Sequence, residues 1–161
     1  MTLSTPHHAD TRNLVITRVL DAPRHAIWRA WSDPEWLKVW WTPKPGTTDV
    51  IALDLQPGGA FHTRIQGPGD CRSEHIGCFL EVIPHARIVF TSMLAAGWRP
   101  AMPGLAFTTL ISLSDYALGS CYTVQVIHQD EITREQHEKS GFFEGWNTAI
   151  SQLEEVACTL R

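Results

Sequence analysis

The chain has 161 residues, of which 43% are hydrophobic and 19% are charged, and its formal net charge is −4. This length fits one domain whose core is large enough to need no disulfide or metal. An acidic balance without a cluster of lysine and arginine excludes the electrostatic pattern of a nucleic-acid-binding protein. No apolar run approaches the roughly 18 to 20 residues that a membrane span needs, so we expect no membrane insertion.

The beginning of the chain is polar and resembles neither a secretion signal nor a transit peptide. We expect residues 1–12 to form a flexible N-terminal segment of a cytoplasmic protein, and residues 13–161 to form a single domain. The four cysteines are scattered, and none belongs to a CxxC pair. Reduced thiols are therefore expected.

The first predicted element is a strand over 13–23, because this segment alternates in hydrophobicity and is rich in β-branched residues. Two short helices should follow it. The stretch HAIWRAW has its apolar residues on one side. In the stretch SDPEW, Ser32 or Asp33 can cap a second helix, and Pro34 suits its first position.

Between residues 47 and 129 the helical period gives way to strands that alternate with turn signals. The connections are short, and short connections join antiparallel neighbours because parallel strands need a crossover of about a dozen residues or more. We therefore expect an antiparallel meander. Its strands are predicted at 47–55, 59–66, 72–83, 87–94, 105–114 and 120–129.

The end of the chain predicts a long amphipathic helix. Apolar residues recur at steps of three and four from Phe142 to Leu160. Thr133 and Gln136 have the spacing of a capping box. One helix over 134–160 would be about 40 Å long and would cover the apolar face of the sheet.

Four stretches of sequence, in chain order, point to a known family. They are DAPRHAIWRAWSDPEWLKVWW at 21–41, DLQPGGAF at 54–61, GCFLEVIPHARIVFT at 77–91 and GWNTAISQLEE at 145–155. They resemble the activator of heat shock protein 90 ATPase-like family of the START-related (SRPBCC) superfamily. The resemblance implies an α+β helix-grip fold, in which a curved seven-stranded antiparallel sheet wraps around a long C-terminal helix, with two short helices between the first two strands.

A sheet wrapped around one helix leaves a hollow that is lined mostly by apolar groups, and we expect a ligand there. Its predicted lining comes from the inward-facing positions of the strands, from the C-terminal helix and from the tryptophans near residue 40. These residues are Trp40, Trp41, Phe61, Cys78, Phe90, Met93, Phe107, Ile111, Val124, Val126, His128, Phe142 and Trp146.

The mouth of this hollow has two candidate components. Trp40 and Trp41 are consecutive and cannot both point into one core, so one of them is the candidate for the mouth, with plain packing as the alternative. The loop 95–104 contains Trp98 and Met102 among prolines and glycines. It suits either a gate over the pocket or a disordered tip.

Two glycines, Gly141 and Gly145, lie four residues apart inside the predicted C-terminal helix. Each costs about 1 kcal/mol relative to alanine at such a position. Either the backbone packs closely against a neighbour there, or the glycines leave space beside the aromatic residues.

Histidines offer the only sign of acid–base or metal chemistry. If GPGD is a four-residue turn, His62 lies directly opposite His75, and a third ligand could complete a metal site. Ile76 and Cys78 resemble the inward set of their strand, however, so a solvated histidine pair is favoured unless a bulge changes the face. His128 faces inward and is either a core histidine with a satisfied hydrogen bond or a functional one.

The chain contains no GxSxG, phosphate-loop, HExxH or zinc-type pattern. We therefore predict no catalytic residue, no metal and no cofactor. The leading hypothesis is a binding protein for a small hydrophobic or aromatic ligand, with a role in regulation or stress. Two alternatives stay open: an enzyme of the cyclase or hydrolase type that uses the same hollow, and an interaction module that contacts a chaperone or a second copy of the chain as a homodimer.

Overall fold

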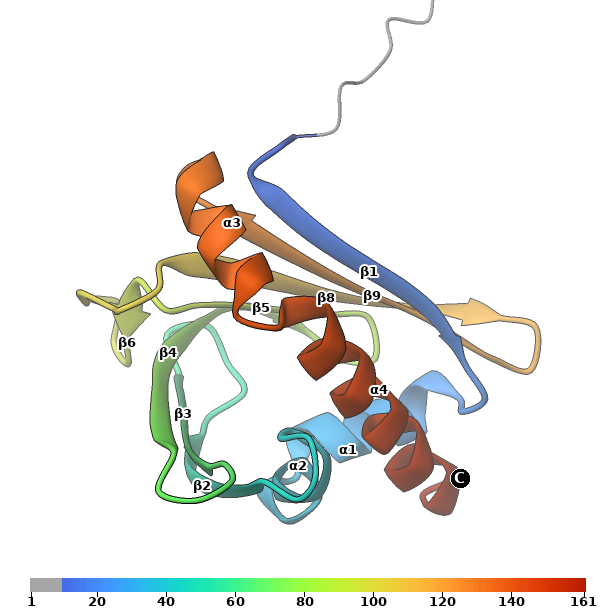
Figure 1. Cartoon of the computed structure of the whole chain (residues 1–161). Helices are drawn as coiled ribbons and strands as arrows, with labels where there is room; N and C mark the ends of the chain where they lie inside the picture. Colours follow the sequence, from blue (N-terminus) through green and yellow to red (C-terminus); the bar gives the residue numbers. More distant parts are fainter. Residues whose placement is uncertain (1–9) are drawn as a thin grey trace, which may run out of the picture.

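A computed structural model describes residues 10–161. The strands are β1 (Asn13–Leu20), β2 (Thr47–Leu53), β3 (Ala60–Gln66), β4 (Arg72–Ile83), β5 (Arg87–Thr91), β6 (Leu94–Ala95), β7 (Arg99–Pro100), β8 (Phe107–Tyr116) and β9 (Gly119–His128). The helices are α1 (Arg24–Ser32), α2 (Pro34–Trp40), α3 (Glu131–Lys139) and α4 (Phe142–Thr159). Figure 1 shows the helices gathered on one side of a strongly curved sheet.

The main sheet has seven strands in the order β1-β9-β8-β5-β4-β3-β2, and every neighbouring pair is antiparallel. The strands from β2 to β9 form the predicted meander, interrupted by the small β6–β7 hairpin. β1 closes the sheet by pairing with β9, and α1 and α2 carry the chain from one edge of the sheet to the other. The α+β helix-grip architecture predicted from the sequence is confirmed.

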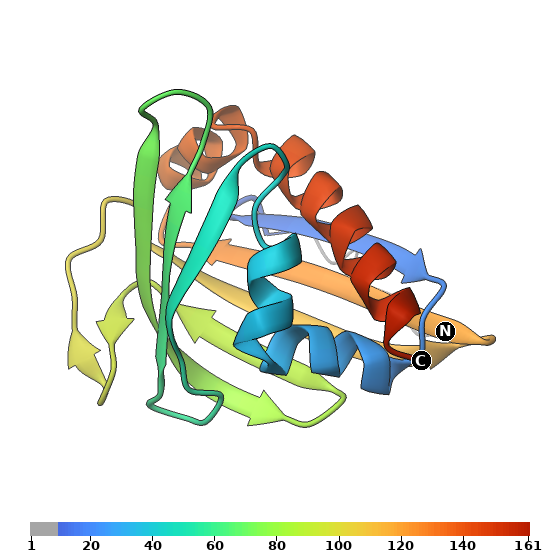
Figure 2. The ribbon, with the colours of Figure 1, turned by 90° about the horizontal axis from the view of Figure 1, so that it is seen from below.

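The C-terminal helix lies across the concave side of this sheet, next to α1 and α2 (Figure 2). The prediction of one unbroken helix over 134–160 is wrong, because the chain forms α3 and then α4. Gly141 separates them with a φ of 96°, a left-handed conformation that glycine adopts at little cost. The predicted capping box is also wrong: the side chain of Asp130 accepts a hydrogen bond from the backbone N–H of Thr133 at 2.7 Å and caps α3.

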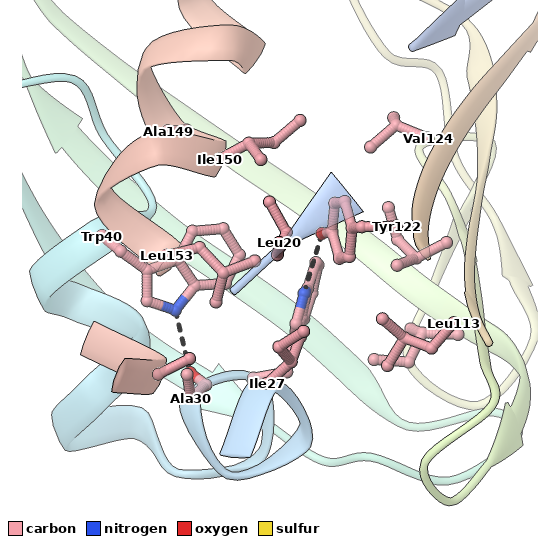
Figure 3. Packing of buried hydrophobic residues seen from close by; sticks show 14 of the residues in the cluster. Leu20, Ile27, Ala30, Trp40, Leu113, Tyr122, Val124, Ala149, Ile150 and Leu153 are labelled. Atoms are coloured by element: carbon pink, nitrogen blue, oxygen red, sulfur yellow. Dashed lines mark hydrogen bonds between the residues drawn. The ribbon is translucent and has the colours of Figure 1, made fainter. Parts of the chain in front are cut away.

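The part of the hollow near the C-terminal end of α4 is filled by core side chains. Ile150 and Leu153 of α4 are fully buried, and Ile150 lies opposite Val124 (Figure 3). Below them, the indole N–H of Trp31 donates a hydrogen bond to the hydroxyl of Tyr122 at 3.0 Å. At this end, the region between α4 and the sheet is therefore a packed core. Any cavity between them must lie toward the start of α4.

The predicted flexible segment 1–12 lies mostly outside the described residues. Within residues 10–12, the carbonyl of Arg12 accepts a backbone hydrogen bond from His128 at 3.1 Å, and the carbonyl of Thr11 accepts one from the guanidinium of Arg134 at 3.0 Å. These bonds tie the chain just before β1 to β9 and α3. Within residues 10–161, no helix combines the length and the apolar character that crossing a membrane requires.

The predicted register between β3 and β4 is wrong by one residue. His75 lies opposite Thr63, and His62 lies opposite Ile76. Because successive residues of a strand point to opposite faces, the slip turns His75 inward and leaves Ile76 half exposed. A β-bulge between Phe79 and Glu81 then changes the alternation in the rest of β4.

Candidate ligand pocket

A pocket of about 270 Å³ lies between the sheet and the junction of α3 with α4. Five of the predicted ligand contacts line it: Trp41, Phe90, Phe107, Phe142 and Trp146. Phe90 comes from β5, Phe107 from β8, and the other three come from the end of α2 and the start of α4. The fold thus brings aromatic rings from four separate segments around one space. Their role in binding a ligand stays a prediction.

The other eight predicted residues lie elsewhere. The lining of this pocket does not include Trp40, Phe61, Cys78, Met93, Ile111, Val124, Val126 or His128. Most of them belong to the packed core, where side chains of α1, α2 and α4 fill the space against the sheet. Cys78 is buried on the opposite face of β4 from His75, and Met93 is partly exposed just after β5.

The structure resolves the choice between the two consecutive tryptophans. Trp40 is fully buried in the core, and its indole N–H donates a hydrogen bond to the carbonyl of Ala30 at 2.9 Å (Figure 3). Trp41 lines the pocket, and its ring meets the ring of Trp146 edge to face at a centroid distance of 5.6 Å. Trp41, which follows α2 directly, and Trp146 of α4 thus form one wall of the pocket.

The two glycines of the C-terminal segment also line the pocket. Apart from the adjacent residues and the backbone of the same helix, a Cβ atom added to Gly141 or to Gly145 would meet no heavy atom of residues 10–161 within 4 Å. Close backbone packing therefore does not explain them. Gly141 is required by its positive φ, whereas Gly145 leaves space beside the ring of Trp146.

His75 lines the pocket from β4 and was not among the predicted site residues. Neither of its ring nitrogens has a hydrogen-bond partner among residues 10–161. Its ring is surrounded by aromatic side chains, with Phe107 stacked at a centroid distance of 5.9 Å and Phe61 edge-on at 5.3 Å. Burial, and secondarily the charge of His62, lowers the pKa of His75 to about 4. The imidazole is therefore neutral at pH 7.

A second histidine, His137 of α3, also lines the pocket and was likewise not among the predicted site residues. Its Nδ1 lies 2.9 Å from Nε2 of His128, and Nδ1 of His128 lies 2.8 Å from the carbonyl oxygen of Arg12. Both ring nitrogens of His128 are thus engaged. His128 is only 3% exposed, which places it in the core as a histidine with satisfied hydrogen bonds rather than in the pocket.

When both rings are neutral, the hydrogen-bond chain fixes the tautomers of these two histidines. A carbonyl oxygen can only accept, so Nδ1 of His128 carries a hydrogen and, in the neutral ring, Nε2 is an acceptor. His137 must then donate from Nδ1, which leaves its Nε2 as an acceptor. Burial, and secondarily the charge of His128, lowers the pKa of His137 to about 4.

The loop 95–104 does not cover this pocket. Trp98 is half exposed and lies against Gly58, where an added Cβ would come within 2.7 Å of the indole nitrogen. Met102 is fully exposed and borders a second hollow of about 400 Å³, whose lining also includes His75 and Phe107. Neither Trp98 nor Met102 belongs to the lining of the first pocket.

The predicted histidine pair of β3 and β4 is not formed. The imidazole of His62 instead contacts the carboxylate of Glu74 on the outer face of the sheet. Within residues 10–161, no group of three or more histidine, cysteine, aspartate or glutamate side chains is arranged to hold a metal ion.

The family described as Activator of Hsp90 ATPase homolog 1-like protein matches residues 21–157. A solved structure of a protein from Nitrosomonas europaea is 38% identical, covers 94% of this chain and 97% of its own, and has a TM-score of 0.88. The comparison with curated proteins found no match.

More distant structures have the same fold. A protein from Mycobacterium smegmatis is 24% identical, with a TM-score of 0.80 and 93% of each chain covered. A protein from Chromobacterium violaceum is 22% identical, with a TM-score of 0.75, and the match covers 89% of this chain and 96% of that one.

Proposed function

The chain belongs to the Activator of Hsp90 ATPase homolog 1-like family, and we propose that it binds a small apolar or aromatic molecule in the pocket at the start of α4. The observation that carries the proposal is the lining itself. Five aromatic rings surround the space, and among residues 10–161 its lining contains no lysine, arginine, aspartate or glutamate. Such a wall favours an occupant that is held by shape and burial.

The size of the pocket limits the ligand and its affinity. An engineered apolar cavity of about 150 Å³ is large enough for benzene, so 270 Å³ suits a substituted ring or a bicyclic molecule. Burying roughly 200 to 300 Å² of apolar ligand surface would contribute about 5 to 7 kcal/mol before the entropic cost of binding. We therefore expect affinities in the micromolar range or weaker.

A pocket-filling variant tests the proposal. The Cβ of Gly145→Leu meets no described atom outside its own helix within 4 Å, so the larger side chain can extend into the pocket without displacing the backbone. Thr148→Leu adds an apolar side chain at an exposed position of the same helix and is the matched control. Tryptophan fluorescence, titrated with a set of lipids and aromatic compounds, should show saturable binding to the native protein and to Thr148→Leu.

For Gly145→Leu we expect binding of the same compounds to be at least about tenfold weaker, because the added side chain takes up ligand volume. Native protein that gave no saturable response to any compound would overturn the proposal. Equal affinity of the native protein and of Gly145→Leu would overturn it as well, because binding would then occur elsewhere.

The description of the family favours a second candidate, contact with the chaperone Hsp90. If this candidate is right, the chain should form a complex with purified Hsp90 and change its ATPase rate, and Gly145→Leu should do the same as the native protein. Sedimentation of the two proteins as separate species would exclude it. The same measurement on the chain alone gives its mass and tests the proposed homodimer.

A further inference from the structure

We propose that the occupant of the pocket is a neutral aromatic molecule that carries a hydroxyl group, such as a naphthol, and that His75, Thr109 and His137 bind this hydroxyl end. This inference rests on the proposed function, because it names the class of ligand for the same pocket. It starts from polar atoms of the lining that the protein itself leaves without partners.

His75 and Thr109 are the first two of these groups. Both ring nitrogens of His75 and the hydroxyl oxygen of Thr109 are buried without a hydrogen-bond partner among residues 10–161. Thr109 lies two positions after Phe107 on β8, so both side chains point to the same face of the sheet. The ring of Phe107 stacks on His75 and joins the two polar groups into one wall of the pocket.

His137 adds a hydrogen-bond acceptor, which is its Nε2 atom. Its Nδ1 is used by the hydrogen bond to His128, so Nε2 is the nitrogen left for a ligand. A bare imidazole nitrogen accepts a hydrogen bond and cannot donate one. It therefore selects a ligand that has a hydrogen to give. A hydroxyl group meets this need, and its oxygen can also accept a bond from the N–H of His75 or from the hydroxyl of Thr109.

The same groups disfavour the two nearest alternatives. A carboxylate would bring a negative charge into a lining with no lysine or arginine and with histidines that are neutral at pH 7, and a buried charge without a partner is strongly unfavourable. A hydrocarbon would leave His75 and Thr109 unpaired. Sites built to bind a hydroxyl group reject analogues that lack it for this reason.

Three ligands of one shape separate these possibilities: 2-naphthol, naphthalene and 2-naphthoate. Each is titrated at pH 7 into protein labelled with ¹⁵N, and the backbone and indole N–H signals of Trp41 and Trp146 are followed. We expect 2-naphthol to bind at least about tenfold more tightly than naphthalene, and 2-naphthoate to bind most weakly. Equal affinities for 2-naphthol and naphthalene would overturn this inference and leave the proposed function intact. Absence of binding by all three would overturn both.

Variants assign the preference to the proposed groups. Thr109→Val is nearly isosteric, and His75→Phe places a similar ring among the aromatic neighbours of His75. Both should lower the ratio of naphthol to naphthalene affinity several-fold by weakening naphthol alone. His25→Phe, at an exposed position of α1, should keep the native ratio. An unchanged ratio in both Thr109→Val and His75→Phe, with native-like spectra, would contradict the assignment.

Discussion

The ring of His75 lies against the ring of Phe107, with centroids 5.9 Å apart and 22° between their planes. A histidine in this position has an apolar neighbourhood but two unpaired nitrogens. Replacing it by phenylalanine keeps the stacking and removes the unpaired polar atoms. We expect His75→Phe to raise the free energy of unfolding by about 1 to 2 kcal/mol in urea denaturation.

His25→Phe is the control for this measurement, because His25 is exposed, and its stability should stay within about 0.5 kcal/mol of native. Loss of more than about 1 kcal/mol in His75→Phe would mean that the imidazole makes a stabilising bond in the folded state.

The stability of the protein should fall on acidification below neutral pH. The pKa values of His75 and His137 are lowered to about 4 in the folded state, against about 6.5 in the unfolded chain. Between these values the unfolded state binds more protons, so the free energy of unfolding decreases as the pH falls from 6.5 to 4. Each histidine contributes a slope of up to about 1.4 kcal/mol per pH unit.

Urea denaturation at a series of pH values measures this slope. Other groups titrate in the same range, so the difference between the native protein and His75→Phe isolates the contribution of one histidine. The variant should show a shallower dependence between pH 6.5 and pH 4. Parallel curves for the two proteins would show that His75 is already protonated or paired in the folded state.

The hydrogen bond between Trp31 and Tyr122 predicts that loss of the Tyr122 hydroxyl destabilises the protein more than loss of the hydroxyl of an exposed tyrosine. Both side chains are fully buried, and the indole N–H donates to the phenol oxygen. Tyr122→Phe removes the acceptor and leaves the indole N–H unsatisfied, which should cost about 1 to 3 kcal/mol of unfolding free energy. Tyr116→Phe, at an exposed site, should cost almost nothing. Equal effects in thermal or urea denaturation would contradict the role of this bond.

The two glycines should respond to alanine in opposite directions. Gly145 is inside α4 with open space around its Cβ position, so Gly145→Ala should stabilise the protein by about 0.5 to 1 kcal/mol through helix propensity. Gly141 has a φ of 96°, and Gly141→Ala should destabilise by about 1 to 2 kcal/mol. Changes of the same sign, in paired urea curves, would show that the break between α3 and α4 is not held by Gly141.

Much of the fold could be predicted from the sequence because it depends on patterns that extend over many residues. The meander follows from strands with short connections. The helix that covers the sheet follows from the apolar period between Phe142 and Leu160. The break at Gly141 could not be read in the same way. A glycine inside an apolar helical pattern is tolerated in many helices, and only the backbone angle reveals that the chain turns there.

The site was harder to predict because it depends on single residues. The loop between β3 and β4 is one residue longer than expected, with Gln66 paired to Arg72, and this slip turned His75 from the outer face to the inner one. The alternation of Val124 and Val126 correctly indicated burial. It could not show that core side chains fill the space beside them, because filling depends on the sizes of side chains from several distant segments.

A crystal structure of the protein grown with 2-naphthol tests the central claim most directly. The account predicts electron density for the ring against the wall formed by Trp41 and Trp146, with the hydroxyl oxygen within hydrogen-bonding distance of His75, Thr109 or His137. Density for the probe at any other place would contradict the account. So would a structure in which Trp41, Phe107 and Trp146 close together and fill the pocket themselves.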